Sequence, residues 1–303
     1  MEPGGAQPGT GRRVLVVEHE AGAPLGRLAV PLLAGDAHLE VLRPWRGEPL
    51  PSGPDALDGV GGLVVLGGQA DSWDDDASPW LPATRTLLAS AARDGVPALG
   101  ICLGAQLLAL ATGGRVERGA RGPEAGLLEV TATAAGRTDP LVAAVLAAAG
   151  APDGSWRAPQ AHGDAVTELP PDAELLASSD LYRVQALRVG ERAWGVQYHP
   201  EVTAPVLAQW LAEHAALLEA RGTSAAAQAA AVEDAEPELA LLAAAHAAVL
   251  LPGEPQDDPR SDPWTGAGTG AGTGAGTGAG TGAGTGAGTG AGTRSRTGRV
   301  SAP

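Results

Sequence analysis

The only cysteine of the chain, Cys102, lies in the segment GICLGAQLLA. The apolar residues before it predict a buried strand over 96–101, and the apolar spacing after it predicts a helix over 103–111. Cys102 would then lie on a tight strand-to-helix turn, with Gly100 and Gly104 leaving room around it. The free N–H groups and the positive dipole end of the helix favour a thiolate, which is the nucleophilic form of the side chain.

A nucleophile needs a base, and the base needs a group that orients it. The segment WGVQYHPEV, residues 194–202, predicts a strand that ends at Pro200. His199 and Glu201 are two residues apart, so an extended chain places them on the same face. With Cys102 they would form a Cys-His-Glu triad. The alternative is that the cysteine merely packs as a small hydrophobic residue, which is common for a buried thiol.

Together the motifs resemble those of the class I (triad-type) glutamine amidotransferases. The resemblance is closest to stand-alone bacterial members similar to the glutaminase domain of GMP synthase, and it covers residues 12–221. Four motifs carry it in the family's order: LGGQADSWDD after a predicted strand at 63–66, GICLGAQ around Cys102, QAHGD at 160–164 followed by ELP, and GVQYHPE around His199.

The resemblance implies that Cys102 attacks the side-chain amide carbon of glutamine, that His199 passes a proton to the departing ammonia, and that Glu201 holds the imidazole. A glutamyl thioester would form and then be hydrolysed to glutamate. Both tetrahedral intermediates carry an oxyanion that needs fixed donors. The expected donors are the backbone N–H groups of Leu103 and Gly68.

The substrate-binding candidates are Gly67, Gln69, Gln106 and His162. Gln106 lies about one helical turn beyond the cysteine, and the resemblance assigns that position to the amino-acid end of the substrate. Three of these candidates have a plainer alternative: a strand-ending turn for Gly67, an exposed helix position for Gln106, and a local backbone cap for His162. Relatives often have proline where this chain has Gln69. The acidic stretch 71–76 that follows is either a solvated loop or a determinant of substrate preference.

Short apolar strands alternating with helical patterns predict an α/β fold of the flavodoxin-like, three-layer type with a mainly parallel central sheet. The pattern between about residues 115 and 196 shifts to shorter strands and predicts a smaller antiparallel excursion. The expected strands are 14–17, 39–42, 63–66, 96–101, 126–132 and 181–188; the expected helices are 25–33, 80–92, 103–111 and 204–220.

The chain is expected to divide into a flexible leader (1–11), an amidotransferase domain (12–221), an alanine-rich helical extension (222–251) and a disordered tail (252–303). Pro237 is expected to interrupt the helical extension. Residues 265–292 are seven copies of Thr-Gly-Ala-Gly, which offer little surface to bury. Deletion of residues 253–303 should therefore leave activity and melting temperature almost unchanged.

Composition and charge exclude some classes of protein. The formal net charge is −15 with no basic stripe, which argues against a nucleic-acid partner. No apolar stretch reaches the roughly 18 residues of a membrane helix, and the first residues do not resemble a signal peptide, so a cytoplasmic location is expected. The single cysteine and the lack of a Cys/His cluster predict neither metal nor cofactor.

Three functions remain open. The first is a glutaminase that supplies ammonia to a separate synthetase chain, because no span is left for a synthetase domain. The second is a stand-alone hydrolase of γ-glutamyl peptides or conjugates that uses the same triad. The third is a non-catalytic binding protein on the same fold, which predicts a damaged triad that the sequence does not show. The width of the pocket near Gln69, Asp71 and His162 should separate the first two.

Overall fold

The computed structural model describes residues 11–251. Most of the predicted leader and all of the predicted tail lie outside the described residues, so the expectations about them stay predictions. No helix within residues 11–251 is long and apolar enough to span a bilayer.

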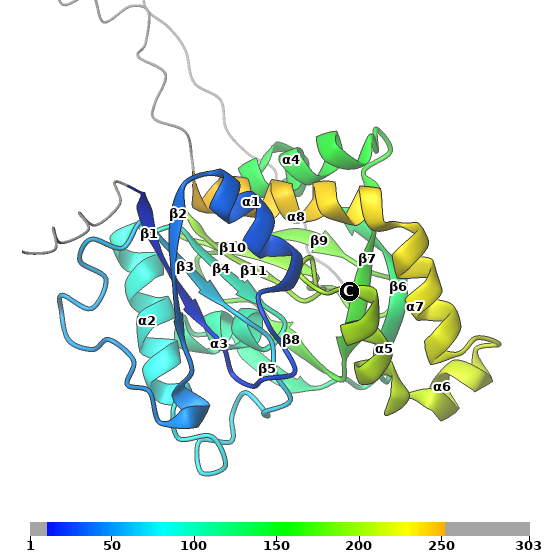
Figure 1. The fold of residues 1–303 in the computed structure, drawn as a ribbon, viewed down its shortest axis with the longest axis horizontal. Helices are drawn as coiled ribbons and strands as arrows, with labels where there is room; N and C mark the ends of the chain where they lie inside the picture. The colour runs from blue at the N-terminus through cyan, green and yellow to red at the C-terminus, as the bar shows by residue number, and fades with distance from the viewer. Residues whose placement is uncertain (1–10, 252–303) are drawn as a thin grey trace, which may run out of the picture. The chain divides into compact units, whose positions relative to one another are not determined.

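The described residues form a nine-stranded sheet with the order β2-β1-β3-β4-β11-β10-β9-β6-β7 (Figure 1). Four of its pairings are parallel and join β1 (Arg12–Val17), β2 (Ala37–Leu42), β3 (Gly62–Val65), β4 (Ala98–Ile101) and β11 (Ala193–Val196). The last three of these strands are buried along their whole length. Such burial is expected of short apolar strands that helices cover on both faces.

The antiparallel excursion extends the same sheet beyond β11. It consists of β6 (Glu124–Ala132), β7 (Ser155–His162), β9 (Ala173–Ser178) and β10 (Ala186–Val189). A separate antiparallel pair joins β5 (Arg115–Arg118) to β8 (Asp164–Glu168). The fold is therefore of the predicted flavodoxin-like α/β class, and the antiparallel strands return the chain to the centre of the sheet.

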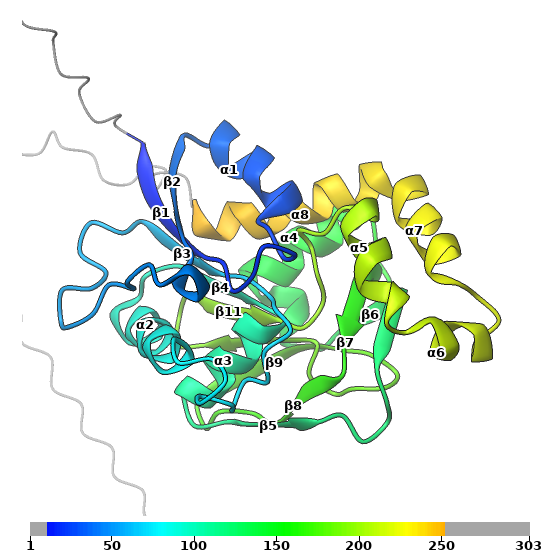
Figure 2. The same ribbon diagram turned by 60° about the horizontal axis from the view of Figure 1, so that its bottom comes forward.

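Helices cover both faces of the sheet, as Figures 1 and 2 show. One face carries α2 (Leu81–Asp94) and α3 (Leu103–Ala111); the other carries α1 (Ala29–Ala34), α4 (Pro140–Ala149) and α8 (Glu236–Leu250). Along the antiparallel strands lie α5 (Ala204–Ala212), α6 (Ala215–Ala220) and α7 (Ala225–Asp234). Two apolar cores result, one on each face.

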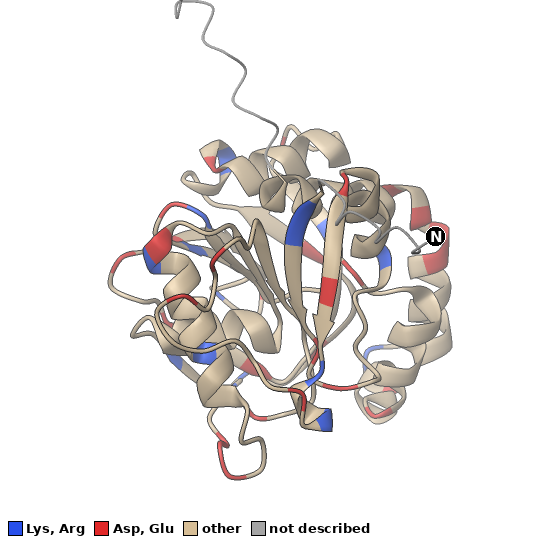
Figure 3. Ribbon diagram, turned by 60° about the vertical axis from the view of Figure 1, so that its left-hand side comes forward, with Lys and Arg blue, Asp and Glu red and all other residues tan. Residues whose placement is uncertain are grey.

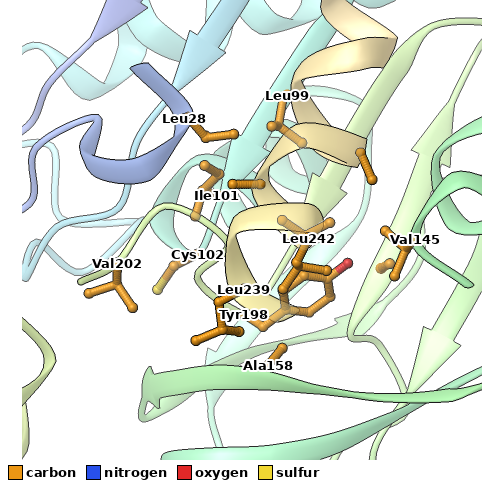
Figure 4. Packing of buried hydrophobic residues seen from close by; sticks show 14 of the residues in the cluster. Leu28, Leu99, Ile101, Cys102, Val145, Ala158, Tyr198, Val202, Leu239 and Leu242 are labelled. Carbon is orange, nitrogen blue, oxygen red and sulfur yellow. The ribbon is translucent and has the colours of Figure 1, made fainter. Parts of the chain in front are cut away.

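Helix α8 belongs to the larger of the two cores. Figure 4 shows Leu239 and Leu242 of this helix beside Tyr198, with Leu99 and Ile101 of β4 in the same cluster. The alanine-rich extension is thus helical, as predicted, and it packs on the domain. Figure 3 shows many of the charged residues on loops and helices, and the central strands β3, β4 and β11 carry none.

Several predicted elements differ from the structure. The helix expected over 25–33 begins as a 3₁₀ turn at Gly26–Leu28, and the strand expected over 181–188 is confined to β10. The helix expected over 204–220 is two helices, because the turn at 213–214 separates α5 from α6. Pro237 does not interrupt a helix: it lies in the first turn of α8, where the missing N–H has no intrahelical partner to lose.

Two buried histidines make stability depend on pH. His246 of α8 accepts a hydrogen bond from the Tyr198 hydroxyl at 3.0 Å and donates one to the Leu242 carbonyl at 2.7 Å, an arrangement that needs the neutral ring. Burial lowers the pKa of His246 to about 4. His19, whose Nδ1 accepts a hydrogen bond from Trp80 Nε1, has its pKa lowered by burial to about 4 as well.

We therefore expect the free energy of unfolding to fall as the pH drops from about 6.5 to about 4, because in that window the unfolded chain binds protons that the folded chain excludes. Each histidine contributes up to ~3 kcal/mol over the window. Urea unfolding at pH 7.5, 6 and 5 measures the effect, and His246→Gln should flatten the slope. An equal slope in the variant and the wild type would contradict the assignment to His246.

Candidate active site

Cys102 lies on the predicted strand-to-helix turn, between β4 and α3. Its backbone has φ +50° and ψ −105°, a conformation that residues other than glycine rarely adopt. The turn is held because α3 lies very close to the sheet: a Cβ on Gly104 would come within 2.1 Å of the Val65 carbonyl oxygen. A Cβ on Gly100 would meet the backbone of the helix in the same way. The two glycines therefore fix the strained turn that presents the thiol.

His199 and Glu201 follow β11, the strand beside β4. The prediction that this strand continues to Pro200 is wrong, because β11 ends at Val196 and the chain then turns. The pairing still forms: His199 Nδ1 lies 2.7 Å from Glu201 Oε1, and both side chains are buried. His199 Nε2 has no hydrogen-bond partner within residues 11–251.

The protonation of His199 follows from this environment. Burial opposes the charged ring, but the carboxylate of Glu201 and the sulfur of Cys102 outweigh it and raise the pKa of His199 to about 10. The imidazolium form is thus favoured next to the thiol, as a proton donor to a leaving group requires.

Contacts between α8 and Arg27 support the segment that carries His199 and Glu201. The Arg27 N–H donates to the Glu201 carbonyl oxygen at 2.8 Å, and the buried Arg27 guanidinium pairs with Glu236 at the start of α8, with Nε to Oε1 at 3.0 Å. Glycine is needed at position 26, since a Cβ there would lie 2.1 Å from the same carbonyl oxygen. The extension therefore reaches the backbone of Glu201 through Arg27.

The loop after β3 brings Gly67 and Gly68 to the thiol. A Cβ on Gly67 would lie 3.0 Å from His199 Cε1 and 3.5 Å from Cys102 Cβ, so Gly67 lies against both side chains. Gly68 lines the cavity in front of them. Within residues 11–251, the N–H groups of Gly68 and Leu103 donate to no protein acceptor. Both are thus free to receive an oxyanion.

We expect Gly67→Ala to lower the rate of amide hydrolysis at least about tenfold, because the added methyl group displaces the imidazole and small misplacements of reacting groups are costly. Gly62→Ala is the matched control: Gly62 begins β3, the strand that leads to this loop, and its Cβ would meet only ordinary contacts, the nearest at 3.4 Å from the Leu250 carbonyl oxygen. Steady-state kinetics with melting temperatures of both variants measure this. Equal activity of the two would contradict the placement of Gly67.

A cavity of about 280 Å³ opens at Cys102 and His199. Of the predicted substrate-binding residues, Gln69, Gln106 and His162 line it, whereas Gly67 contacts the two reactive side chains instead. The other lining residues are Glu20, Ala23, Gly68, Ala70, Asp71, Arg118, Ala161, Gly163, Asp164, Trp210, Glu213 and His214. No group of three or more His, Cys, Asp or Glu side chains suited to a metal ion is present in the described part of the chain.

Gln106 and His162 are firmly held in the wall of the cavity. Gln106 Nε2 lies 3.3 Å from both the Asp164 carbonyl oxygen and Gln197 Oε1. His162 uses both ring nitrogens, at 2.8 Å from the Asp164 carbonyl oxygen and 2.9 Å from the Glu124 carboxylate. Burial would raise the pKa of Glu124, but hydrogen bonds, above all from His162, outweigh it and lower that pKa. His162 thus caps local backbone, and it also forms part of the wall of the cavity.

The sequence did not indicate Glu20, Arg118, Trp210 or Glu213. Trp210 lies in α5, and its indole ring packs against the His199 ring with centroids 4.7 Å apart. Arg118 pairs with Asp71 and Asp164, each at 2.9 Å. Only Glu20 had a usable signal: it follows β1 at the carboxyl edge of the parallel strands, where open α/β sheets bind ligands.

The fold and the site define an α/β protein that gathers a cysteine, a histidine and a glutamate at the carboxyl ends of parallel strands. The chain belongs to the class-I glutamine amidotransferase family, whose family model matches residues 52–214.

Individual proteins that are similar to this chain are consistent with this family. One subunit of the glutamine-hydrolysing GMP synthase of Natronomonas pharaonis is 36% identical over 150 residues, 49% of this chain and 70% of that protein. Gamma-glutamyl peptidase 5 of Arabidopsis thaliana is 34% identical over 151 residues, half of this chain, which spans only 57% of the peptidase. A crystal structure of a glutamine amidotransferase from Thermotoga maritima has a TM-score of 0.68 and 26% identity, covering 80% of this chain and 99% of that one.

Proposed function

We propose that this protein is a glutaminase that hydrolyses the side-chain amide of glutamine through a cysteinyl thioester and supplies ammonia to a separate acceptor enzyme. One observation carries the proposal. The thiol of Cys102, on a strained turn, opens into the same cavity as His199, and the imidazole of His199 is held by Glu201 at 2.7 Å. Membership of the amidotransferase family supports it.

In this mechanism the sulfur of Cys102 bonds to the amide carbon, and the C–N bond breaks as His199 Nε2 delivers its proton to the departing nitrogen. The thioester is then attacked by water, whose proton returns to His199, and glutamate leaves as the C–S bond breaks. Glu201 keeps the imidazole oriented and stabilises its charged form throughout.

The oxyanion of each tetrahedral intermediate binds to the N–H groups of Gly68 and Leu103. The Leu103 N–H is free because the first N–H groups of a helix have no intrahelical acceptor. Gln106 and His162, fixed by the wall of the cavity, form the surface on which the amino-acid end of the substrate rests, and Gln69 closes the loop side.

The acceptor of the ammonia is a separate synthetase chain in this proposal, and the protein acts in the cytoplasm. The similarity to one chain of a GMP synthase supports the first point, since that relative is by name one subunit of a larger enzyme.

A second candidate function is the hydrolysis of γ-glutamyl conjugates by the same triad. It is favoured by the extent of the cavity, which continues beyond the reactive side chains to Glu20, Trp210 and Glu213. The similarity to a plant γ-glutamyl peptidase points the same way.

Glutamate release by the purified full chain tests the proposal, with glutamine and a panel of γ-glutamyl amides as substrates and Cys102→Ala as the control. Cysteine-dependent release from glutamine is the expected result. Release from conjugates alone would replace the glutaminase with the second candidate. No glutamate release from any substrate, with an added synthetase subunit as well as without one, would overturn both.

A further inference from the structure

The wall of the cavity beside His199 is acidic. It is formed by the loop after β1, the loop after β3 and the end of α5, which meet at Gln69: the backbone N–H of Gln69 lies 3.2 Å from Glu20 Oε2, and its side-chain Nε2 lies 3.5 Å from Glu213 Oε1. The Trp210 indole joins the same wall through a 3.1 Å hydrogen bond to the Gly22 carbonyl oxygen. We call Glu20, Trp210 and Glu213 the leaving-group wall.

The position of this wall follows from the chemistry of His199. A departing amine must lie next to the imidazole that protonates it, and the Trp210 ring packs directly on that imidazole. His199 Nε2 is buried, lines the cavity and has no hydrogen-bond partner within residues 11–251, so it is available for that amine. Any substituent on the amine therefore extends along the leaving-group wall.

Apart from the protonated His199 and its partner Glu201, the charges of the cavity are divided between its two sides. Arg118 is paired with Asp71 and Asp164 on the side of His162. In the described part of the chain, the carboxylates of Glu20 and Glu213 form no ion pair and accept hydrogen bonds only from Gln69. His214 is the basic residue of the lining nearest to Glu213 in sequence. Two carboxylates beside a leaving group favour a cation there.

We propose that the preferred conjugate substrate is a γ-glutamyl amide whose amine portion bears a second, positively charged amino group. This inference rests on the proposed hydrolysis of γ-glutamyl amides and names the substrate class of that activity. Trp210 offers an aromatic face to the methylene chain or to the ammonium itself, while Glu20 and Glu213 neutralise the charge.

Three amides of the glutamyl γ-carboxyl with four-carbon amine portions make the matched test: the 4-aminobutylamide (cationic), the butylamide (neutral) and the 3-carboxypropylamide (anionic). Assays with the full chain at pH 8.5 keep ordinary imidazoles neutral. We expect kcat/KM for the cationic amide to exceed that for the neutral one about tenfold, with the anionic amide slowest, and we expect 0.5 M salt to reduce the ratio.

Glu20→Gln combined with Glu213→Gln should bring the ratio of the cationic to the neutral amide close to one. Glutamine keeps an acceptor for both Gln69 hydrogen bonds, so the change is one of charge. Glu219→Gln, on the exposed surface of α6 and away from the cavity, is the matched control and should keep the wild-type ratio.

Equal rates for the three amides, a preference for the anionic one, or a ratio that survives the double substitution would each overturn the inference while leaving γ-glutamyl hydrolysis intact. If the protein hydrolyses glutamine but none of the three amides, the inference is overturned and the second candidate function is removed. The salt dependence of the wild type provides the same test should the double variant fail to fold, because an uncharged wall predicts a ratio that salt does not change.

Discussion

Replacement of Cys102 by alanine is expected to abolish amide hydrolysis, with a loss of at least about 10⁴-fold in kcat. The reason is that the lining of the cavity contains no other thiol and no hydroxyl side chain: Cys102 is the only cysteine of the chain, and its sulfur is presented by the turn between β4 and α3. The fold should persist, because alanine keeps the Cβ and removes only the sulfur atom from the edge of the core.

The measurement is glutamate release under single-turnover and steady-state conditions, with circular dichroism and the melting temperature of the same preparations. Because the chain holds one cysteine, alkylation by iodoacetamide followed by mass spectrometry reports on this position alone. Alkylation of the wild type should inactivate it, and substrate should slow the alkylation. Substantial turnover by Cys102→Ala would remove the nucleophile assignment and with it the thioester.

The turn around the nucleophile could be predicted from the sequence because its determinants are local. An apolar run, a cysteine flanked by glycines and a helical pattern occupy consecutive residues, and the structure places α3 over Leu103–Ala111 as predicted. The glycines at 100 and 104 are needed for contacts that a Cβ would block, so the local pattern and the packing carry the same information.

The path of the chain to His199 could not be predicted in this way. Strand β11 ends early because the backbone beyond it bonds to other partners: the Gln197 N–H donates to the Gln185 carbonyl oxygen and the His199 N–H to that of Pro159. Pro159 lies in β7, far away in the sequence, and Gln185 lies just before β10. The contact between His199 and Glu201 survives because it depends on their separation of two residues rather than on a regular strand.

The leaving-group wall could not be predicted from the sequence for a similar reason. Glu20, Trp210 and Glu213 come from opposite ends of the domain and meet only because α5 ends beside the loops that follow β1 and β3. The break between α5 and α6 at residues 213–214, which has neither glycine nor proline, is set by tertiary packing and has no signature in the sequence.

The largest expected effect outside the nucleophile is that of Glu201→Gln, for which we expect kcat to fall at least about 100-fold. Glutamine is of the same size, but it carries no charge and presents either a carbonyl oxygen or an NH₂ group to His199 Nδ1. Glu201 Oε2 has no hydrogen-bond partner within residues 11–251, so no fixed neighbour orients the substituted amide. The orientation of the imidazole and its positive charge are both weakened.

The pH dependence separates this role from a structural one. The charge of Glu201 contributes to raising the pKa of His199 to about 10, so its removal lowers that pKa. Activity that requires the protonated imidazole is lost as the pH rises through this value, and the alkaline limb of the kcat profile in Glu201→Gln should therefore move to lower pH. In a Cys102→Ala background the same substitution should change nothing further, because groups that act as one unit are not additive. An unchanged alkaline limb in a folded variant would show that Glu201 serves stability alone.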